Sequence, residues 1–439
     1  MSSPFSQSLA PGEEARIRAA CGRRDAGAVR VMLESNPALR EWINEPVFSF
    51  NSPAIVAFAN DAAMLDVLLA FGADPNRRSA WWAGGFHALH SATGEAADML
   101  VAAGAIPDAC AAAHLDRPDL LARLIGDDLS RVHERGGDGQ TPLHFAQSRT
   151  VIDLLLAAGA DIDARDVDHR ATAAEWMLDH SRGAGRYELA RYLVERGAAE
   201  DIFLAAALGH SDRVRELTRS GSGLLDLRTG QGAYGEQAPS SFHIYFWTIG
   251  DGRSPLDVAA QFWHQDTLRV LMEFASPVQR LLFHCRRGEE RDARAVLHDH
   301  PGIISSMSPS EHRAISDAAW SGDVEAVRIM LELGFDPLTP GHDSGTALHC
   351  AAWNGSPATV AALLRHRAAS SLVAIRDAHH AATPLGWCCH GSRFGKTGHD
   401  HAGVARLLLE AGARPGNDSR DASRSVASVL AEWREAPDT

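Results

Sequence analysis

The chain of 439 residues is too long for one ordinary hydrophobic core and suits either several domains or one extended repeat array. Its formal net charge of −14 argues against nucleic-acid phosphates and anionic membranes as partners, because both require clustered Lys and Arg. The six cysteines are scattered and form no CxxC pair, which is typical of a reduced, cytoplasmic protein. No signal peptide is visible, and no apolar run approaches the ~20 residues of a membrane helix. We therefore expect a soluble, cytoplasmic protein.

Composition and periodicity divide the chain into five segments. Residues 1–12 are polar and rich in Pro and Ser, and we expect a disordered lead there. Residues 13–217 are a series of paired short helices, which is interrupted by a Gly/Ser-rich insertion at 218–251. The helical series resumes over 252–415, and 416–439 is a closing helix with a polar tail.

The clearest unit of the first series is 138–166, which reads DGQTPLHFAQSRTVIDLLLAAGADIDARD. Gly139 favours a tight turn, Thr141 is a helix N-cap, and Pro142 occupies the first helical position, where its missing N–H loses no bond. A second helix follows and ends at Gly159 in a left-handed conformation. Two helices this short cannot bury their apolar faces alone, so the unit needs copies of itself on both sides.

The segments that interrupt or close the array have their own patterns. The aromatic run at 242–247, FHIYFW, lies in the insertion and predicts a short strand there. Near the end of the chain, the stretch 422–435 places Val426, Val429 and Leu430 on one helical face together with Trp433. We interpret that helix as a cap over the open end of the array.

These units, about 33 residues long, resemble the ankyrin repeat over nearly the whole chain. The motifs that carry the resemblance are Thr141-Pro142-Leu143-His144 with Gly159-Ala160-Asp161, Ala347-Leu348-His349, Thr383-Pro384-Leu385 and Gly72-Ala73-Asp74. The resemblance implies an all-α ankyrin-repeat solenoid of about twelve helix-pair repeats, with hairpin loops, irregular insertions and a C-terminal capping helix. The wider arrangement, with WWAGGF, RDVDH, HIYFWTIG and GWCCHGS, is similar to a lineage of bacterial ankyrin-repeat proteins without an assigned role.

Three residues in the second half of the array stand at equivalent positions of successive repeats. Trp320 and Trp353 are 33 residues apart, and His390 is their counterpart in the next unit. Because equivalent positions of adjacent repeats stack, we expect the three side chains to form a ladder. The functional hypothesis is an aromatic recognition stripe, since Trp is favoured at binding hot spots. The alternative is simple packing between repeats.

Further tryptophans and histidines are candidates in the rest of the chain. Trp81 and Trp82 fall at an expected hairpin tip, and Trp247 ends the aromatic run of the insertion. Exposed tryptophans imply a partner, which is either another protein or the neighbouring repeats of this chain. The histidines of the TPLH position are expected to tie neighbouring loops together through hydrogen bonds, as the resemblance implies; they are His90, His144 and His349.

Two groups of polar residues are candidates for metal binding or catalysis. A cluster of Cys388, Cys389, His390, His399 and His401 is a weak zinc candidate, because adjacent cysteines on a helix point about 100° apart and no known finger spacing is present. We expect no metal and no cofactor.

The second polar group is Asp166, Asp168 and His169, which lie in one expected hairpin loop and offer a carboxylate–histidine pair. No nucleophile is spelled out nearby, and the chain has no Walker loop, G-x-S-x-G or H-E-x-x-H motif. Catalysis by this loop is therefore the weaker interpretation.

The sequence favours a protein-interaction scaffold, adaptor or inhibitor that binds through the concave face and loop tips of the solenoid. Its acidic balance suggests a protein partner with a basic patch, and neither nucleic acid nor membrane. The alternative is an enzyme whose pocket is formed by the 218–251 insertion and the 390–402 loop around His390. Convergence of both segments on one cavity would favour that alternative.

Overall fold

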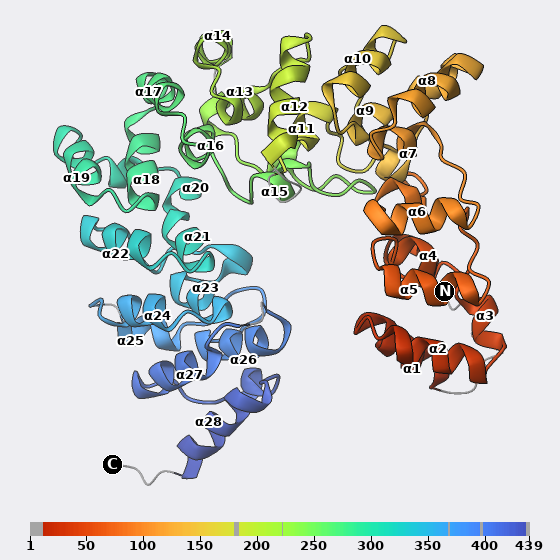
Figure 1. The fold of residues 1–439 in the computed structure, drawn as a ribbon. Coiled ribbons are helices and arrows are strands. Elements are labelled where there is room, and N and C mark those ends of the chain that lie inside the picture. The colour runs from red at the N-terminus through yellow and green to blue at the C-terminus, as the bar shows by residue number, and fades with distance from the viewer. Residues whose placement is uncertain (1–11, 180–183, 222, 368, 396–397, 436–439) are drawn as a thin grey trace. The chain divides into compact units, whose positions relative to one another are not determined.

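The computed structural model describes residues 12–179, 184–221, 223–367, 369–395 and 398–435. Residues 1–11 of the expected disordered lead lie outside this part. The chain forms two compact units, Met1–Leu271 and Met272–Thr439. Both are built from short helices packed in succession (Figure 1). The described residues contain isolated β-bridges but no strand, so the expected all-α class is confirmed.

The α-helices of the first unit are α1 (Glu13–Gly22), α2 (Ala26–Ser35), α3 (Ala38–Trp42), α4 (Ala54–Ala57), α5 (Ala62–Ala70), α6 (Gly94–Ala102), α7 (Ala109–His114), α8 (Pro118–Asp127), α9 (Pro142–Phe145), α10 (Arg149–Ala157), α11 (Ala173–Trp176), α12 (Ala184–Glu195), α13 (Ile202–Leu208), α14 (Ser211–Ser220), α15 (Tyr245–Thr248) and α16 (Pro255–Gln261). The unit boundary falls within α17 (Gln265–Phe274). The α-helices of the second unit are α18 (Pro277–Arg286), α19 (Glu290–Asp299), α20 (Pro309–His312), α21 (Ala314–Trp320), α22 (Val324–Leu333), α23 (Ala347–Asn354), α24 (Pro357–Leu364), α25 (Ala369–Ala374), α26 (Pro384–Phe394), α27 (His401–Glu410) and α28 (Arg424–Glu435).

Short 3₁₀ turns occur between several of these helices. They are η2 (Ser49–Asn51), η3 (Ala88–His90), η4 (Leu129–His133), η5 (Gly137–Gly139), η7 (Leu224–Asp226), η8 (Gly232–Tyr234), η9 (Ile304–Ser306), η10 (His342–Ser344) and η11 (Asn417–Ser419).

The pair α9 and α10 shows why the repeated unit folds as it does. Thr141 is the N-cap of α9, and its N–H donates to His144 Nδ1 at 3.2 Å. Ser148 caps the start of α10. Beyond the end of this helix, Gly159 has φ +91°, a conformation that glycine adopts at little cost. The start and end signals predicted from the sequence are therefore confirmed. The helices of a pair contact each other and the helices of the next pair, which buries the apolar stripe that neither helix buries alone.

The insertion differs from its expected form. The aromatic run at 242–247 forms no strand; it leads into the single helical turn α15. The physical reason is that its tyrosine reaches a polar partner. Tyr245 Oη and Tyr234 Oη donate to the carboxylate of Asp201 at 3.0 Å and 2.8 Å, and both rings pack against Phe203. A strand would turn alternate side chains away from this cluster.

The last helix, α28, begins at Arg424, two residues after the expected start of the closing helix. Val426, Val429 and Leu430 are buried in the core of the second unit, whereas Trp433 remains 39% exposed. Residues 436–439 of the expected tail lie outside the described residues. Within the described chain, none of the helices has the length and apolar character needed to span a bilayer.

Candidate functional site

Three helices of the second unit carry aromatic side chains at the same repeat position. Trp320 ends α21, Trp353 is near the end of α23, and His390 lies on α26. The two indoles are stacked with their centroids 5.9 Å apart and their planes 5° from parallel. The ring of His390 continues the stack at 5.5 Å from Trp353. The 33-residue spacing in the sequence therefore predicted a real side-chain ladder.

The structure adds one aromatic ring at each end of this ladder. His342, in η10, stacks on Trp320 with centroids 4.5 Å apart, and Phe394 lies 4.6 Å from His390. Phe394 follows His390 by four residues on α26, a spacing that places both on one helix face and could have been found from the sequence. We call His342, Trp320, Trp353, His390 and Phe394 the aromatic ladder.

The ladder is supported from beneath by Trp387. This indole is 6% exposed and stands nearly perpendicular to Trp320 and Trp353, with centroids 6.4 Å from each. Its Nε1 donates to Asp377 Oδ2 at 2.8 Å. Because a buried hydrogen bond fixes Trp387, the two stacked indoles rest on a rigid base.

The ladder combines exposed rings with acidic neighbours. The side chain of Phe394 is 57% exposed and that of His390 50%, whereas Trp320 and Trp353 are half-buried. Asp421 Oδ2 lies 3.4 Å from His390 Nδ1, and Asp317 Oδ1 lies 3.4 Å from His342 Nε2. The surface therefore offers flat apolar faces bordered by carboxylates.

The segment after α26 packs against the end of α23. His401 Nε2 lies 2.9 Å from the carbonyl of Trp353, and His399 Nδ1 is bonded to the carbonyl of Asn354. The N–H of Asp400 donates to the carbonyl of Gly355 at 3.1 Å. Gly355 has φ +71°, and a Cβ there would meet the ring of His401 at 2.6 Å. Both histidines thus secure the loop; residues 396–397 of the expected 390–402 loop lie outside the described residues.

The weak zinc candidate in this region is not assembled. Among the described residues, three-ligand groups whose donor atoms lie within 4.8 Å of one another include none of Cys388, Cys389, His390, His399 and His401. Burial raises the pKa of Cys388 well above its usual range and that of Cys389 to about 11. Without a metal, both thiols therefore hold their protons at neutral pH.

The tryptophans of the first unit differ in accessibility. Trp82 is 44% and Trp247 62% exposed. Trp81 is half-buried, and its ring packs edge-on against Phe50 at 5.2 Å. The most exposed of these indoles is Trp263, at 78%, which sequence reasoning missed because it lies inside an otherwise ordinary repeat.

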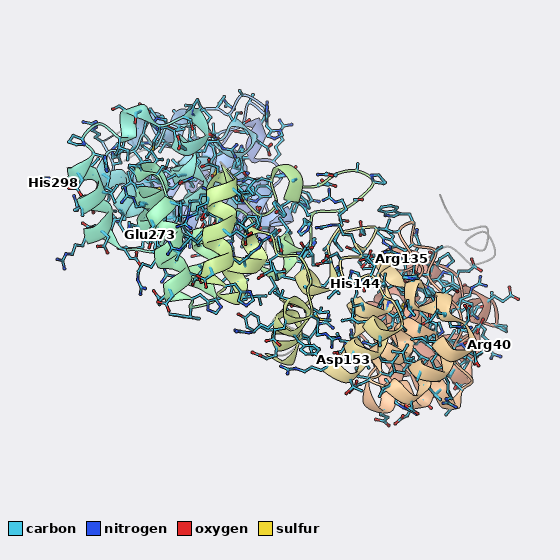
Figure 2. All side chains as sticks on the ribbon, turned by 90° about the horizontal axis from the view of Figure 1, so that it is seen from above. Arg40, Arg135, His144, Asp153, Glu273 and His298 are labelled. Atoms are coloured by element: carbon cyan, nitrogen blue, oxygen red, sulfur yellow. The ribbon has the colours of Figure 1, made fainter. Side chains whose placement is uncertain are left out.

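The histidines of the TPLH position tie loops together as expected. His144 Nε2 lies 3.0 Å from the carbonyl of Ala171, and His349 Nε2 lies 3.1 Å from that of Ala382. His90 Nε2 lies 2.9 Å from Asp108 Oδ2. In the region of His144, Arg135 Nη1 donates to the carbonyls of Gly139 and Arg165; the side chains of His144 and Arg135 can be located in Figure 2. These groups join the hairpins of neighbouring repeats.

The two aspartates of the polar loop in the first unit, Asp166 and Asp168, have different roles. Asp166 accepts the N–H groups of His169 and Ala171 at 2.8 Å and 2.6 Å, so it shapes its own loop. The expected carboxylate–histidine pair is formed by Asp168 instead, with Oδ2 3.8 Å from His169 Nε2. Asp138, from the preceding hairpin, joins this pair. Burial, followed by repulsion from Asp168 and Asp166, raises the pKa of Asp138 to about 6, although His169 opposes the rise.

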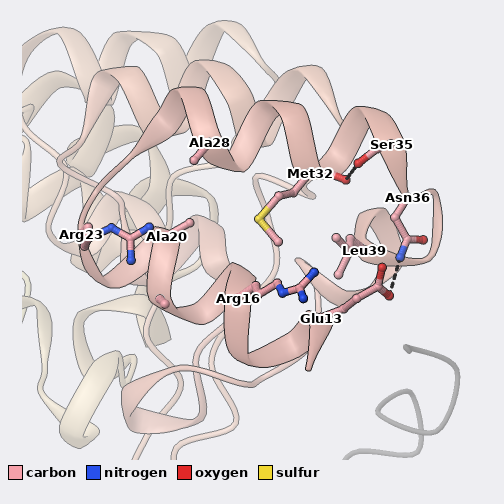
Figure 3. Close-up of a pocket in the computed structure, with 10 residues that line it drawn as sticks. Glu13, Arg16, Ala20, Arg23, Ala28, Met32, Ser35, Asn36 and Leu39 are labelled. Atoms are coloured by element: carbon pink, nitrogen blue, oxygen red, sulfur yellow. Dashed lines mark hydrogen bonds between the residues drawn. The ribbon is translucent and has the colours of Figure 1, made fainter. Parts of the chain in front are cut away.

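A hollow with a volume of about 370 Å³ lies between α1, α2 and α3 (Figure 3). Its lining includes Met32 and Leu39, and Asn36 Nδ2 donates to Glu13 Oε2 at 2.8 Å across it. Neither His390 nor any residue of the insertion lines it. The pocket around His390 that the enzyme hypothesis requires stays a prediction.

The family models agree with this architecture of stacked helix pairs joined by hairpins. A family model of three ankyrin repeats matches residues 312–419, which contain the whole aromatic ladder, and a model of one ankyrin repeat matches residues 138–167. Among solved structures, the crystal structure of the human ASB11 ankyrin repeat domain covers 63% of this chain and 100% of that chain, with 17% sequence identity and a TM-score of 0.30. The chain therefore contains ankyrin repeats in both of these regions. Ankyrin repeats are generally protein–protein interaction modules.

Proposed function

We propose that the second unit binds a protein partner through the aromatic ladder and acts as a scaffold, adaptor or inhibitor. The observation that supports this is the parallel stack of Trp320 and Trp353, which continues into the exposed rings of His390 and Phe394. Contiguous apolar patches bordered by polar groups are typical of interaction sites, and Trp is enriched among hot-spot residues.

The support from Trp387 favours binding by a preformed surface. Its ring contacts both indoles of the ladder, and its own position is set by the hydrogen bond to Asp377. A surface that is already ordered loses little conformational entropy when a partner docks.

The acidic border of the ladder suggests the chemistry of the partner. Asp317 and Asp421 stand beside the outer rings, and the whole chain carries a net charge of −14. An arginine of the partner would stack its planar guanidinium on an indole and pair with a carboxylate. We therefore propose a partner segment with basic side chains, whose association is accelerated by electrostatic attraction.

The first unit offers a smaller set of candidate contacts. Trp82 and Trp247 remain proposed partner-binding residues because both are exposed. The ring of Trp81 is occupied by Phe50, so we assign it a supporting role beneath the exposed Trp82, whose ring centroid lies 6.2 Å away.

Affinity capture from the native host with wild-type and ladder variants tests the proposal. We expect Trp353→Ala and His390→Ala to lose the captured partner, with a Kd at least about 30-fold higher for Trp353→Ala, as for a hot-spot residue. Trp263→Ala is the matched control, because it removes an exposed indole outside the ladder. Thermal unfolding is measured on each variant.

Two results would contradict the proposal. One is a partner retained by a folded Trp353→Ala variant. The other is a partner lost equally with Trp263→Ala. A collapse of the fold in Trp353→Ala, with normal capture by His390→Ala, would show that the ladder serves packing between repeats.

A further inference from the structure

Two neighbouring hairpin loops of the first unit bring three metal-ligating side chains together. Asp138 comes from η5, and Asp168 and His169 come from the hairpin of the next repeat. One ligand atom from each side chain lies within 4.8 Å of the other two. Ligand bonds of about 2.1 Å hold the donor atoms of a metal site about 3.5 Å apart, so a small closure of the two loops would complete the geometry.

One oxygen of the Asp138 carboxylate is poorly satisfied by hydrogen bonds. Asp138 is 7% exposed, and its buried Oδ1 has no hydrogen-bond partner of normal geometry among the described residues. The indole of Trp81 faces this carboxylate, yet Trp81 Nε1 also lacks a partner of normal geometry. The main chain cannot turn the group away, because the carbonyl of Asp138 accepts the N–H groups of Val167 and Asp168 at 2.9 Å and 3.1 Å. A buried carboxylate oxygen with so poor a hydrogen bond is stabilised by a cation or a proton.

The hydrogen bonds of the second hairpin leave two more atoms able to coordinate a metal beside Asp138. They are Nε2 of His169 and Oδ2 of Asp168. His169 Nδ1 lies 2.8 Å from the carbonyl of Phe242; a carbonyl only accepts, so Nδ1 carries the hydrogen. In the neutral ring, Nε2 then has a free lone pair. Ser241 N–H donates to Asp168 Oδ1 at 2.9 Å, and Oδ2 faces His169 Nε2. A histidine oriented by a backbone carbonyl is the usual arrangement of a metal ligand.

Two arginines of this region direct their hydrogen bonds at carbonyl groups, so these bonds do not neutralise the Asp138 carboxylate. Arg135 bonds to the carbonyls of Gly139 and Arg165, and Arg170 bonds to those of Gly235 and Ser241.

A second group of three potential metal ligands in the same unit differs in how its carboxylate is hydrogen-bonded. Asp108, which lies with His90 and Cys110, accepts hydrogen bonds from Ala111 N at 2.7 Å and from Arg78, and it pairs with His90. Its carboxylate is satisfied by the protein itself, whereas that of Asp138 is not.

We propose that Asp138, Asp168 and His169 bind one Zn²⁺ ion, which joins two hairpins to the insertion. The donor set of one imidazole and two carboxylates leaves a position for water in a tetrahedral site. Ca²⁺ fits poorly, because it takes six to eight oxygen ligands and no imidazole. Through Ser241 and Phe242, which contact Asp168 and His169, the ion would stabilise the docked insertion.

Isothermal titration of the chelator-stripped full chain with ZnCl₂, together with elemental analysis after dialysis, tests this site. We expect one bound Zn²⁺ per wild-type chain and an increase in melting temperature on Zn²⁺ addition. Asp138→Asn and His169→Gln should each lose this equivalent. Circular dichroism of the stripped variants shows whether they fold; Asp138→Asn keeps the size of the side chain and removes the buried charge.

His380→Gln is the matched control. His380 occupies the equivalent hairpin position of the second unit, where its side chain is 61% exposed. The control should bind Zn²⁺ like the wild type. The proposal is overturned if the wild type binds no stoichiometric Zn²⁺, if folded Asp138→Asn and His169→Gln both retain it, or if His380→Gln loses it to the same extent.

Discussion

Two hairpins of the molecule, Arg165–Thr172 in the first unit and Arg376–Thr383 in the second, have nearly the same local structure and different surroundings. In each, an aspartate shapes the loop by accepting two main-chain N–H groups. Asp166 accepts from His169 and Ala171, and Asp377 accepts from His380 and Ala382. The arginine before each aspartate donates to a carbonyl five residues later. The local sequence accounts for this geometry in both.

The difference lies in what covers the two loops. In the first unit, Ser241 and Phe242 of the insertion bond to Asp168 and His169, whose side chains are 2% and 12% exposed. In the second, the residues at the same two positions, His379 and His380, are 63% and 61% exposed. One loop thus becomes a buried polar cluster and the other remains a solvated surface. The same hairpin acquires different chemistry from the segment that packs on it.

The largest effect is expected from removal of the loop-shaping aspartates. Asp377→Ala leaves the N–H groups of His380 and Ala382 and the indole N–H of Trp387 without their acceptor. At about 1–3 kcal/mol for each orphaned buried group, we expect a loss of about 4 kcal/mol in the free energy of unfolding. Asp166→Ala orphans two groups and should cost less. Urea unfolding followed by tryptophan fluorescence compares them; a greater loss in Asp166→Ala would break the equivalence of the hairpins.

A pH-dependent loss of stability is expected next, and it should be common to both hairpins. Burial lowers the pKa of His349 to about 4 and also lowers that of His144. The unfolded histidine binds a proton near pH 6.5, so between about 6.5 and 4 the unfolded state holds more protons. The contribution of His349 is therefore fully present above pH 6.5 and is lost as the pH falls towards 4, by up to about 3 kcal/mol.

Denaturation at pH 7.5 and pH 5 measures this effect in the wild type and in His349→Gln. The variant should show a flatter pH dependence, and His380→Gln, whose side chain is exposed, should keep the wild-type slope. A variant His349→Gln that loses as much stability on acidification as the wild type would show that other groups carry the pH dependence.

The smallest expected effects come from the difference between the hairpin that the insertion covers and the hairpin that remains exposed. With chelator present, His169→Ala loses the hydrogen bond to the carbonyl of Phe242 and the edge contact with Trp176 at 5.2 Å. We expect a loss of about 1–2 kcal/mol, against less than about 0.5 kcal/mol for His380→Ala. Hydrogen exchange of the insertion amides should increase only in His169→Ala. Equal effects in the two variants would mean that the insertion does not stabilise the first hairpin.

Much of the fold could be predicted because its signals are local. Thr141, Pro142 and Gly159 determine where helices begin and end through bonds that span only a few residues. The pairing of Trp320 with Trp353 was also predictable, since a constant repeat length converts sequence spacing into stacking. His342 and Trp387 were not found, because they reach the ladder from a hairpin tip and from the layer beneath it.

By itself, the sequence determined the helix pairs, the hairpins between them and the aromatic ladder, because each depends on short-range caps or on repetition. Only the tertiary structure decided the form of the insertion and the burial of Asp138, Asp168 and His169. The insertion has no repeat period, so its path depends on distant partners such as Asp201, whose carboxylate accepts hydrogen bonds from Tyr234 and Tyr245. Burial of a loop depends on whichever segment covers it, and nothing in the loop itself records that segment.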